Sequence, residues 1–170
     1  HMSRKTANVS CRFIGIVILA LCATIPFHGN LAQVREKPAP ARSSQTGLVF
    51  DPIYLSHLAG DTGHPERPER LTAIMNGLEK SDVLKGLIRI APRRATEEEL
   101  GLVHSPSYLA LVQRELSGMQ GLHNLSTGDT LASPGTFEAA HYAAGGVLNA
   151  VDSVMANRVK NAFCAVRPPG

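Results

Sequence analysis

The sequence has no tryptophan and few other aromatic residues, with 3 tyrosines and 5 phenylalanines among 170 residues. Proteins that bind single-stranded nucleic acid commonly stack bases on aromatic side chains, so this scarcity argues against such a surface. The net charge is only +3, and the basic residues before position 43 are Arg4, Lys5, Arg12, Arg35, Lys37 and Arg42. The remainder is close to neutral and lacks a basic stripe. We therefore expect no nucleic-acid partner.

Cysteine is also scarce, with Cys11 and Cys22 near the N-terminus and only Cys164 in the later part of the chain. A single cysteine in the expected globular part cannot form an internal disulfide. Cys164 lies in the apolar run 162–166, and no basic partner that would favour a reactive thiolate can be assigned to it. We interpret Cys164 as a small buried hydrophobic residue rather than a nucleophile.

The chain has one long uncharged apolar run, residues 13–25, which is too short to span a bilayer comfortably. Basic residues precede it and Pro26 follows, as in a secretory signal peptide. His1–Met2 resembles a cloning scar, so we interpret residues 1–32 as scar and signal peptide, cleaved after Ala32. The expected location is secreted or periplasmic, with no membrane contact after cleavage. A retained anchor is the open alternative.

Residues 33–45 are rich in proline, alanine, arginine and serine and show no hydrophobic period, which is typical of a disordered linker. The globular part is expected over residues 46–170. Its length is enough for one domain.

Apolar runs at 46–50, 87–90 and 161–166 predict three buried strands. Apolar spacing of three and four residues predicts helices between them, over 70–80 and from Pro134 to about residue 155. Shorter helices are expected after Thr96 and after Ser105. Strands that alternate with helices predict an α/β fold, a parallel sheet flanked by helices on both faces.

Local signals mark several helix ends. Thr96 and Glu99 form the pattern of a capping box, so Glu97–Glu99 is interpreted as a helix start and not as an acid–base pair. Ser133–Pro134 predicts the start of the long helix, with the serine as N-cap. Gly145–Gly146 weakens that helix by roughly 1 kcal/mol per glycine, which suggests a close approach to the sheet.

Two segments carry a family resemblance: Gly63–Leu71, which reads GHPERPERL, and Asn161–Gly170, which reads NAFCAVRPPG. Between them, 104–108 and 128–134 follow in the same order and spacing. Together these segments resemble the histone deacetylase and acetylpolyamine amidohydrolase superfamily, nearest to its class II and bacterial branches. The resemblance covers nearly all of 46–170.

The resemblance implies an arginase-like α/β fold with an eight-stranded parallel sheet, of which about three strands are present. It also implies hydrolysis of acetyl-lysine or acetylated polyamines. In the family, one Zn²⁺ held by two aspartates and a histidine polarises the acetyl carbonyl and activates water. Adjacent histidines act as general base and acid, and a tyrosine donates to the oxyanion.

The family's histidine pair directly follows the Arg-Pro-Pro-Gly run, which here ends at Gly170. We therefore expect the catalytic residues and zinc ligands to lie beyond this chain. No catalytic or metal residue is assigned within it, Zn²⁺ is not expected to bind it, and the chain alone is expected to be inactive.

The resemblance assigns only peripheral roles. His64, Pro65 and Glu66 match the rim of the substrate tunnel, and Arg70 matches a position that lines the channel below the active site. Asp129 or Thr130 matches a polar substrate contact before the long helix. Each assignment has a structural alternative. His64 is then a loop residue hydrogen-bonded to backbone, Arg70 a partner of Glu66, and Asp129 a turn residue.

The other histidines of the expected globular part are His57, His104, His123 and His141. None has metal-ligand spacing with a cysteine or carboxylate, so we interpret them as structural or solvent-exposed. Two functions stay open at this stage. The chain is the N-terminal part of a deacetylase acting on acetylated amines, or it is a non-catalytic remnant or subunit that needs a partner to complete its fold. The oligomeric state is not predicted.

Overall fold

The structure of the protein is a computed structural model that describes residues 43–61 and 63–169. The expected signal peptide at 1–32 and nearly all of the expected linker at 33–45 lie outside the described residues.

A parallel three-stranded sheet forms the centre of the fold. Its strands are β1 (Thr46–Val49), β2 (Leu87–Arg89) and β5 (Asn161–Cys164), in the order β2-β1-β5. The central strand β1 pairs in parallel with both neighbours. This arrangement confirms the predicted parallel sheet and the positions of its three strands.

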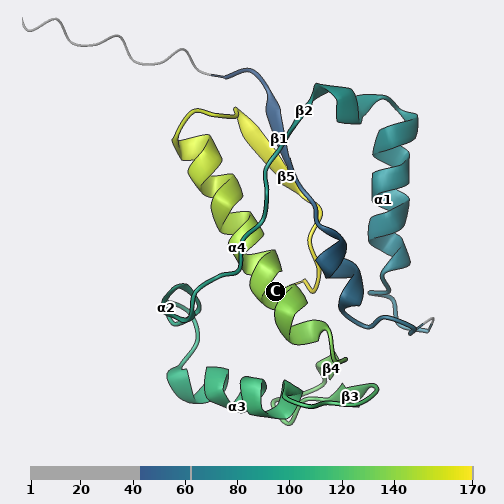
Figure 1. The fold of residues 1–170 in the computed structure, drawn as a ribbon, viewed down its shortest axis with the longest axis vertical. Coiled ribbons are helices and arrows are strands. Elements are labelled where there is room, and N and C mark those ends of the chain that lie inside the picture. Colours follow the sequence, from purple (N-terminus) through teal and green to yellow (C-terminus); the bar gives the residue numbers. More distant parts are fainter. Residues whose placement is uncertain (1–42, 62, 170) are drawn as a thin grey trace, which may run out of the picture. The chain divides into compact units, whose positions relative to one another are not determined.

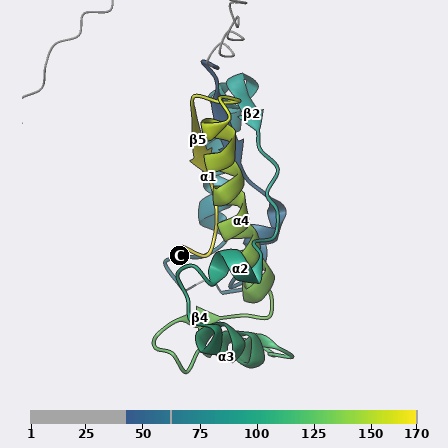
Figure 2. The ribbon, with the colours of Figure 1, turned by 90° about the vertical axis from the view of Figure 1, so that its left-hand side faces the viewer.

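Helices cover both sides of this sheet. The helical elements are α1 (Glu69–Lys80), α2 (Glu97–Leu100), α3 (Pro106–Leu116) and α4 (Thr136–Met155), with short 3-10 turns η1 (Pro52–Ser56) and η2 (Val83–Gly86). Helix α4 packs across β1 and β5, and α1 lies on the opposite side of the strands (Figures 1 and 2). The predicted α/β class with helices on both faces is therefore confirmed.

The main core lies between α4, β1 and η1. Val49 and Tyr54 are fully buried in it, together with Ala143 of α4. The Tyr54 hydroxyl donates a hydrogen bond to the carbonyl of Tyr142 at 3.1 Å. Because this hydroxyl is buried and partnered, η1 is held firmly against the middle of α4.

Two adjacent glycines allow α4 to approach its neighbours closely. A Cβ on Gly145 would lie 2.0 Å from the carbonyl oxygen of Arg93, and one on Gly146 would lie 2.9 Å from Val49. Real Cβ contacts at these distances are excluded by sterics. The predicted close approach to the sheet is thus confirmed at Gly146, while Gly145 accommodates the chain that follows β2.

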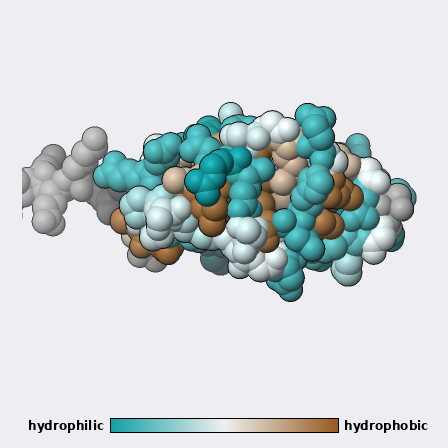
Figure 3. All heavy atoms as spheres, turned by 90° about the horizontal axis from the view of Figure 1, so that it is seen from below, coloured by the Kyte–Doolittle hydropathy of each residue, from teal (hydrophilic) through white to brown (hydrophobic). Residues whose placement is uncertain are grey.

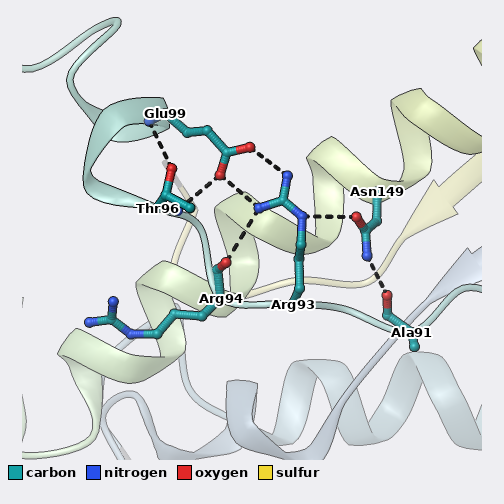
Figure 4. A network of polar contacts seen from close by, with 6 residues as sticks. All are labelled: Ala91, Arg93, Arg94, Thr96, Glu99 and Asn149. Atoms are coloured by element: carbon teal, nitrogen blue, oxygen red, sulfur yellow. Dashed lines mark hydrogen bonds and ion pairs between the residues drawn. The ribbon is translucent and has the colours of Figure 1, made fainter.

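A polar network fixes the chain that follows β2 over α4 (Figure 4). Glu99 and Thr96 form the predicted capping box, with Glu99 Oε2 accepting from the Thr96 amide at 2.9 Å. Arg93 donates to the same carboxylate and, through Nε, to Asn149 Oδ1 at 3.0 Å. The hydrogen bond from Arg93 is the main reason that the pKa of Glu99 falls to about 2.

Ser133 was predicted as the N-cap of α4, and this prediction is wrong. Helix α4 begins at Thr136, and Gly135 precedes it without a side-chain cap. The buried Ser133 hydroxyl instead accepts a hydrogen bond from the amide of Leu58 at 2.9 Å. The Ser133 hydroxyl oxygen, which would accept the hydrogen bond in an N-cap, is used in this contact with the distant residue Leu58.

The polar segment between α3 and α4 contains a short antiparallel pair, β3 (His123–Asn124) and β4 (Leu131–Ala132). Leu125 and Ala132 are buried there with Leu116, the last residue of α3. A second small hydrophobic cluster therefore supports this region. Sequence periodicity did not predict β3 and β4, because each strand has only two residues.

Strands β2 and β5 were both predicted to be buried, and both predictions are wrong. The residues of β2 are half-buried or exposed, and those of β5 alternate between exposed and half-buried, with Cys164 only half-buried. Phe163 is 43% exposed. The reason is position: β2 and β5 are the two edge strands of the sheet, and among the described residues each pairs only with β1. Within the same residues, no helix is long and apolar enough to cross a membrane.

Candidate functional site

A cleft of about 170 Å³ opens between the start of α1 and the carboxyl end of β5. Its lining includes the charged residues Glu66, Arg70 and Arg167 beside apolar ones such as Leu71 and Phe163. In α/β proteins with parallel sheets, ligands bind beyond the carboxyl ends of the strands. The cleft therefore lies where proteins of this fold class usually bind their ligands.

A second hollow, of about 370 Å³, lies at the end of α3 beside β3. It is larger but more open, and it lies away from the parallel sheet. Its acidic residue, Glu115, already accepts hydrogen bonds from the amide and hydroxyl of Ser126. We assign the candidate site to the smaller cleft because of its place at the strand ends.

The segment between η1 and α1 contributes Glu66 to the cleft, and Asp61 organises the residues before it. The Asp61 Oδ1 atom accepts from the amides of Gly63 at 2.8 Å and His64 at 3.2 Å. The ring Nδ1 of His64 in turn accepts from the amide of Glu66 at 3.0 Å. Since Nδ1 is the acceptor, the neutral ring carries its proton on Nε2.

His64 therefore fits the structural alternative, a loop residue hydrogen-bonded to backbone. Its ring is half-buried, whereas Pro65 beside it is exposed. No interaction among the described residues decides whether either one contacts a substrate, so both stay predicted rim residues.

Arg70 combines its two predicted roles. It forms an ion pair with Glu66, four residues earlier, and it also lines the cleft. Its position in the first turn of α1 directs it toward the carboxyl end of β5. Its role as a channel residue remains a prediction.

Arg167 is a residue of the site to which sequence reasoning assigned no role. It is only 2% exposed, and its Nη1 donates to the carbonyls of His57 at 2.6 Å and Tyr54 at 3.2 Å. These bonds tie the end of β5 to η1. Burial lowers the pKa of Arg167. The available signal was a charged residue placed directly after an apolar strand run.

His57, whose carbonyl accepts the bond from Arg167, is almost fully buried. Its Nδ1 lies 2.9 Å from the hydroxyl oxygen of Thr136, at the start of α4. Burial lowers the pKa of His57 to about 4, and the nearby charge of Arg167 adds to this effect. His57 is therefore neutral near pH 7 and joins η1 to α4.

The remaining histidines also have the predicted structural or exposed roles. His141 is buried and bonds through Nδ1 to the Phe137 carbonyl at 2.8 Å. His104 stacks on Tyr108, and both His104 and His123 are exposed.

Asp129 and Thr130 are not brought into the cleft. Both are exposed in the turn between β3 and β4, and neither is among the residues that line the cleft. The Thr130 carbonyl accepts from the Leu125 amide at 2.9 Å. The turn position of Asp129 fits its structural alternative, while a contact with a bound substrate stays a prediction.

Comparison with known proteins now gives the class. The family pattern described as "Histone deacetylase domain" matches residues 64–170, and the chain belongs to this family. Polyamine deacetylase HDAC10 from Homo sapiens is 44% identical over 108 residues, covering 62% of this chain and 16% of the relative. A protein described as a probable deacetylase from Archaeoglobus fulgidus is 35% identical over 127 residues, covering 74% of this chain and 34% of the relative.

A solved structure supports the same assignment. The structure titled "Crystal Structure of HDA15 HD domain" matches with a TM-score of 0.68 and 33% identity, over 75% of this chain and 37% of that chain. The chain thus spans well under half the length of the relatives that it matches.

The histone deacetylase family is zinc-dependent. Zinc sites of this kind need at least three side chains of the His, Asp, Glu or Cys type brought together. Within residues 43–61 and 63–169 no such group of three comes together. The described residues do not by themselves fit a zinc site, and no step of a reaction is assigned to a metal on them.

Proposed function

We propose that this chain is the N-terminal part of a zinc-dependent deacetylase that hydrolyses the amide of an acetylated amine and releases acetate. The observation that supports this most is the cleft at the carboxyl end of β5, where Arg70 and Arg167 lie within the residues that match the family. In this proposal Arg70 lines the channel beside the site, and the catalytic residues come from outside the described residues.

The proposed substrates are acetylated polyamines or acetyl-lysine. A 44% identical relative is named a polyamine deacetylase, which favours the polyamine. His64 and Pro65 form part of the proposed rim. Asp129 or Thr130 adds a polar contact, and an exposed carboxylate such as Asp129 attracts a cationic amine by charge complementarity.

The test uses the whole protein, expressed from its gene, with an acetylated spermidine and an acetyl-lysine peptide. We expect acetate release that stops on zinc chelation and returns with added zinc. Asp129→Asn should raise KM for the polyamine by about three- to tenfold with little change in kcat, because one rim charge is lost. Asp152→Asn, an exposed charge change on α4, is the matched control. No acetate release from either substrate refutes the proposal.

We also propose that the protein is exported, since a basic segment and an apolar run precede the folded part. N-terminal sequencing of protein recovered outside the cytoplasm should find a start near Gln33. A full-length N-terminus there would indicate a retained anchor instead.

A second candidate function is a docking subunit whose sheet is completed by a partner. The exposure of β5 and of an apolar stripe on α4, where Met155 is 77% exposed, favours it. Acetate release by the whole protein separates the two candidates, because only the deacetylase candidate expects it. If residues 43–170 alone bind zinc stoichiometrically and release acetate, the docking candidate fails, and so does our expectation that the catalytic residues lie elsewhere.

A further inference from the structure

Arg167 carries a buried charge whose hydrogen bonds are only partly made. Its Nη1 is satisfied by two backbone carbonyls, whereas Nε and Nη2 have no partner among the described residues. These two nitrogens form the edge of a guanidinium that binds a carboxylate side-on with two parallel hydrogen bonds. Buried donors of this kind are costly when they stay unpaired.

The charged groups around Arg167 are Glu66, Glu69 and Arg70, and His57 is neutral. The Glu66 charge is the largest contribution that opposes the effect of burial on the pKa of Arg167. Glu66 and Arg167 line the same cleft, whereas Glu69 does not. Glu66 is therefore the carboxylate best placed to reach the unpaired Nε and Nη2 atoms of Arg167.

Glu66 already forms an ion pair with Arg70, but this pairing stabilises the fold less than a pairing with Arg167 would. The side chain of Arg70 is 53% exposed and that of Glu66 is 30% exposed. An ion pair between such exposed side chains contributes little to stability, because water solvates the two charges almost as well when they separate. The unpaired donors of Arg167 are out of reach of water, so the same carboxylate stabilises the fold more when it contacts Arg167.

We propose that Glu66 is a positioning residue shared by two arginines, exchanging between Arg70 and the Nε–Nη2 edge of Arg167. When it pairs with Arg167, the segment between η1 and α1 is fastened to the end of β5, and Arg70, which lines the cleft, has no ion pair with Glu66. When it pairs with Arg70, that fastening loosens. The contacts are independent of the proposed function, and only their effect on turnover rests on it.

The direct test is nuclear magnetic resonance of the arginine Nε–H groups in the whole protein, with Arg167 assigned by the signal that Arg167→Lys removes. We expect a protected Arg167 signal whose hydrogen exchange becomes about tenfold faster in Glu66→Gln, since a charged acceptor is lost. Glu69→Gln removes the same charge from a nearby exposed position and should change the rate less than about twofold.

Arg70→Gln provides a second arm if Glu66→Gln does not fold. Releasing Glu66 from Arg70 should leave the Arg167 signal equally or more protected. The proposal is overturned if Glu66→Gln leaves exchange unchanged, if Glu69→Gln matches its effect, or if Arg70→Gln accelerates exchange.

Turnover separates this proposal from the deacetylase assignment. With an acetylated substrate, Glu66→Gln should lower kcat more than it raises KM, and Glu66→Asp should restore part of the loss. An inactive wild type refutes the assignment but leaves the resonance test valid. An active enzyme with an unaltered Arg167 signal in Glu66→Gln refutes only the shared-carboxylate proposal.

Discussion

At the scale of single residues, the buried His57 makes the stability of this fold depend on pH. In the unfolded chain its pKa is near 6.5, and burial lowers it to about 4 in the folded protein. The folded protein therefore resists protonation that the unfolded chain accepts. Stability from His57 is complete above pH 6.5 and is lost as the pH falls toward 4, by at most about 3 kcal/mol.

His57→Asn removes this titration while keeping a polar group beside Thr136. We expect the variant to be less stable than the wild type at pH 7 but to lose less stability between pH 6.5 and 4. Thermal unfolding of the whole protein at several pH values measures the difference. His123→Asn, at an exposed position, should keep the wild-type slope. Parallel slopes for His57→Asn and wild type would contradict the role given to His57.

Some residues of the site could be predicted from sequence and others could not, for a physical reason. Arg70 follows a recognisable loop pattern, and its pairing with Glu66 needs only helical spacing. The bonds of Arg167 join carbonyls more than a hundred residues earlier in the chain. No local pattern encodes such a contact. Ser133, whose hydroxyl bonds to Leu58 rather than capping α4, was mispredicted for the same reason.

At the scale of elements, α4 depends on its glycines for packing rather than for flexibility. Gly145→Ala would improve helix propensity but place a methyl group against the carbonyl of Arg93. We expect a net destabilisation of about 1–3 kcal/mol, because backbone must move to relieve the overlap. Calorimetry of the whole protein measures it.

Gly77→Ala in α1 is the matched control for that prediction. Gly77 is exposed, and a Cβ there would meet nothing within 4 Å. Alanine should stabilise the protein by about 0.5–1 kcal/mol through helix propensity alone. If both substitutions stabilise the protein, the close packing of α4 at Gly145 is not what requires glycine.

The apolar pattern of the sequence predicted the longer helices and the strands of the parallel sheet, and it missed short elements such as η1. The strands β1 and β2 and the helices α1 and α4 have enough apolar residues to show a period. The turn η1 depends instead on Asp51, which accepts from the Ile53 amide, and on the distant carbonyl of Tyr142. Its position beside the cleft therefore emerges only when β1, α4 and β5 are assembled.

At the scale of the whole molecule, the described residues leave much apolar surface uncovered. Val147, Val151 and Met155 recur at four-residue intervals along α4 and are all exposed, as are Leu102 and Val103 after α2. Figure 3 shows hydrophobic surface among polar surface on the face seen from below. Apolar patches on this scale are typical of surfaces that another chain or segment covers.

The 170-residue chain, purified alone, should therefore self-associate or pack loosely, because an edge strand and an apolar helix stripe both invite contact with other chains. Light scattering with thermal unfolding tests this, and we expect concentration-dependent oligomers and a broad transition. Replacing Val151 and Met155 with lysine should reduce association, whereas Thr72→Lys, at an exposed polar position of α1, should not. A monomer with a sharp, cooperative transition would mean that these exposed side chains are tolerated by the fold, and that β5 needs no neighbour to hold the cleft in shape.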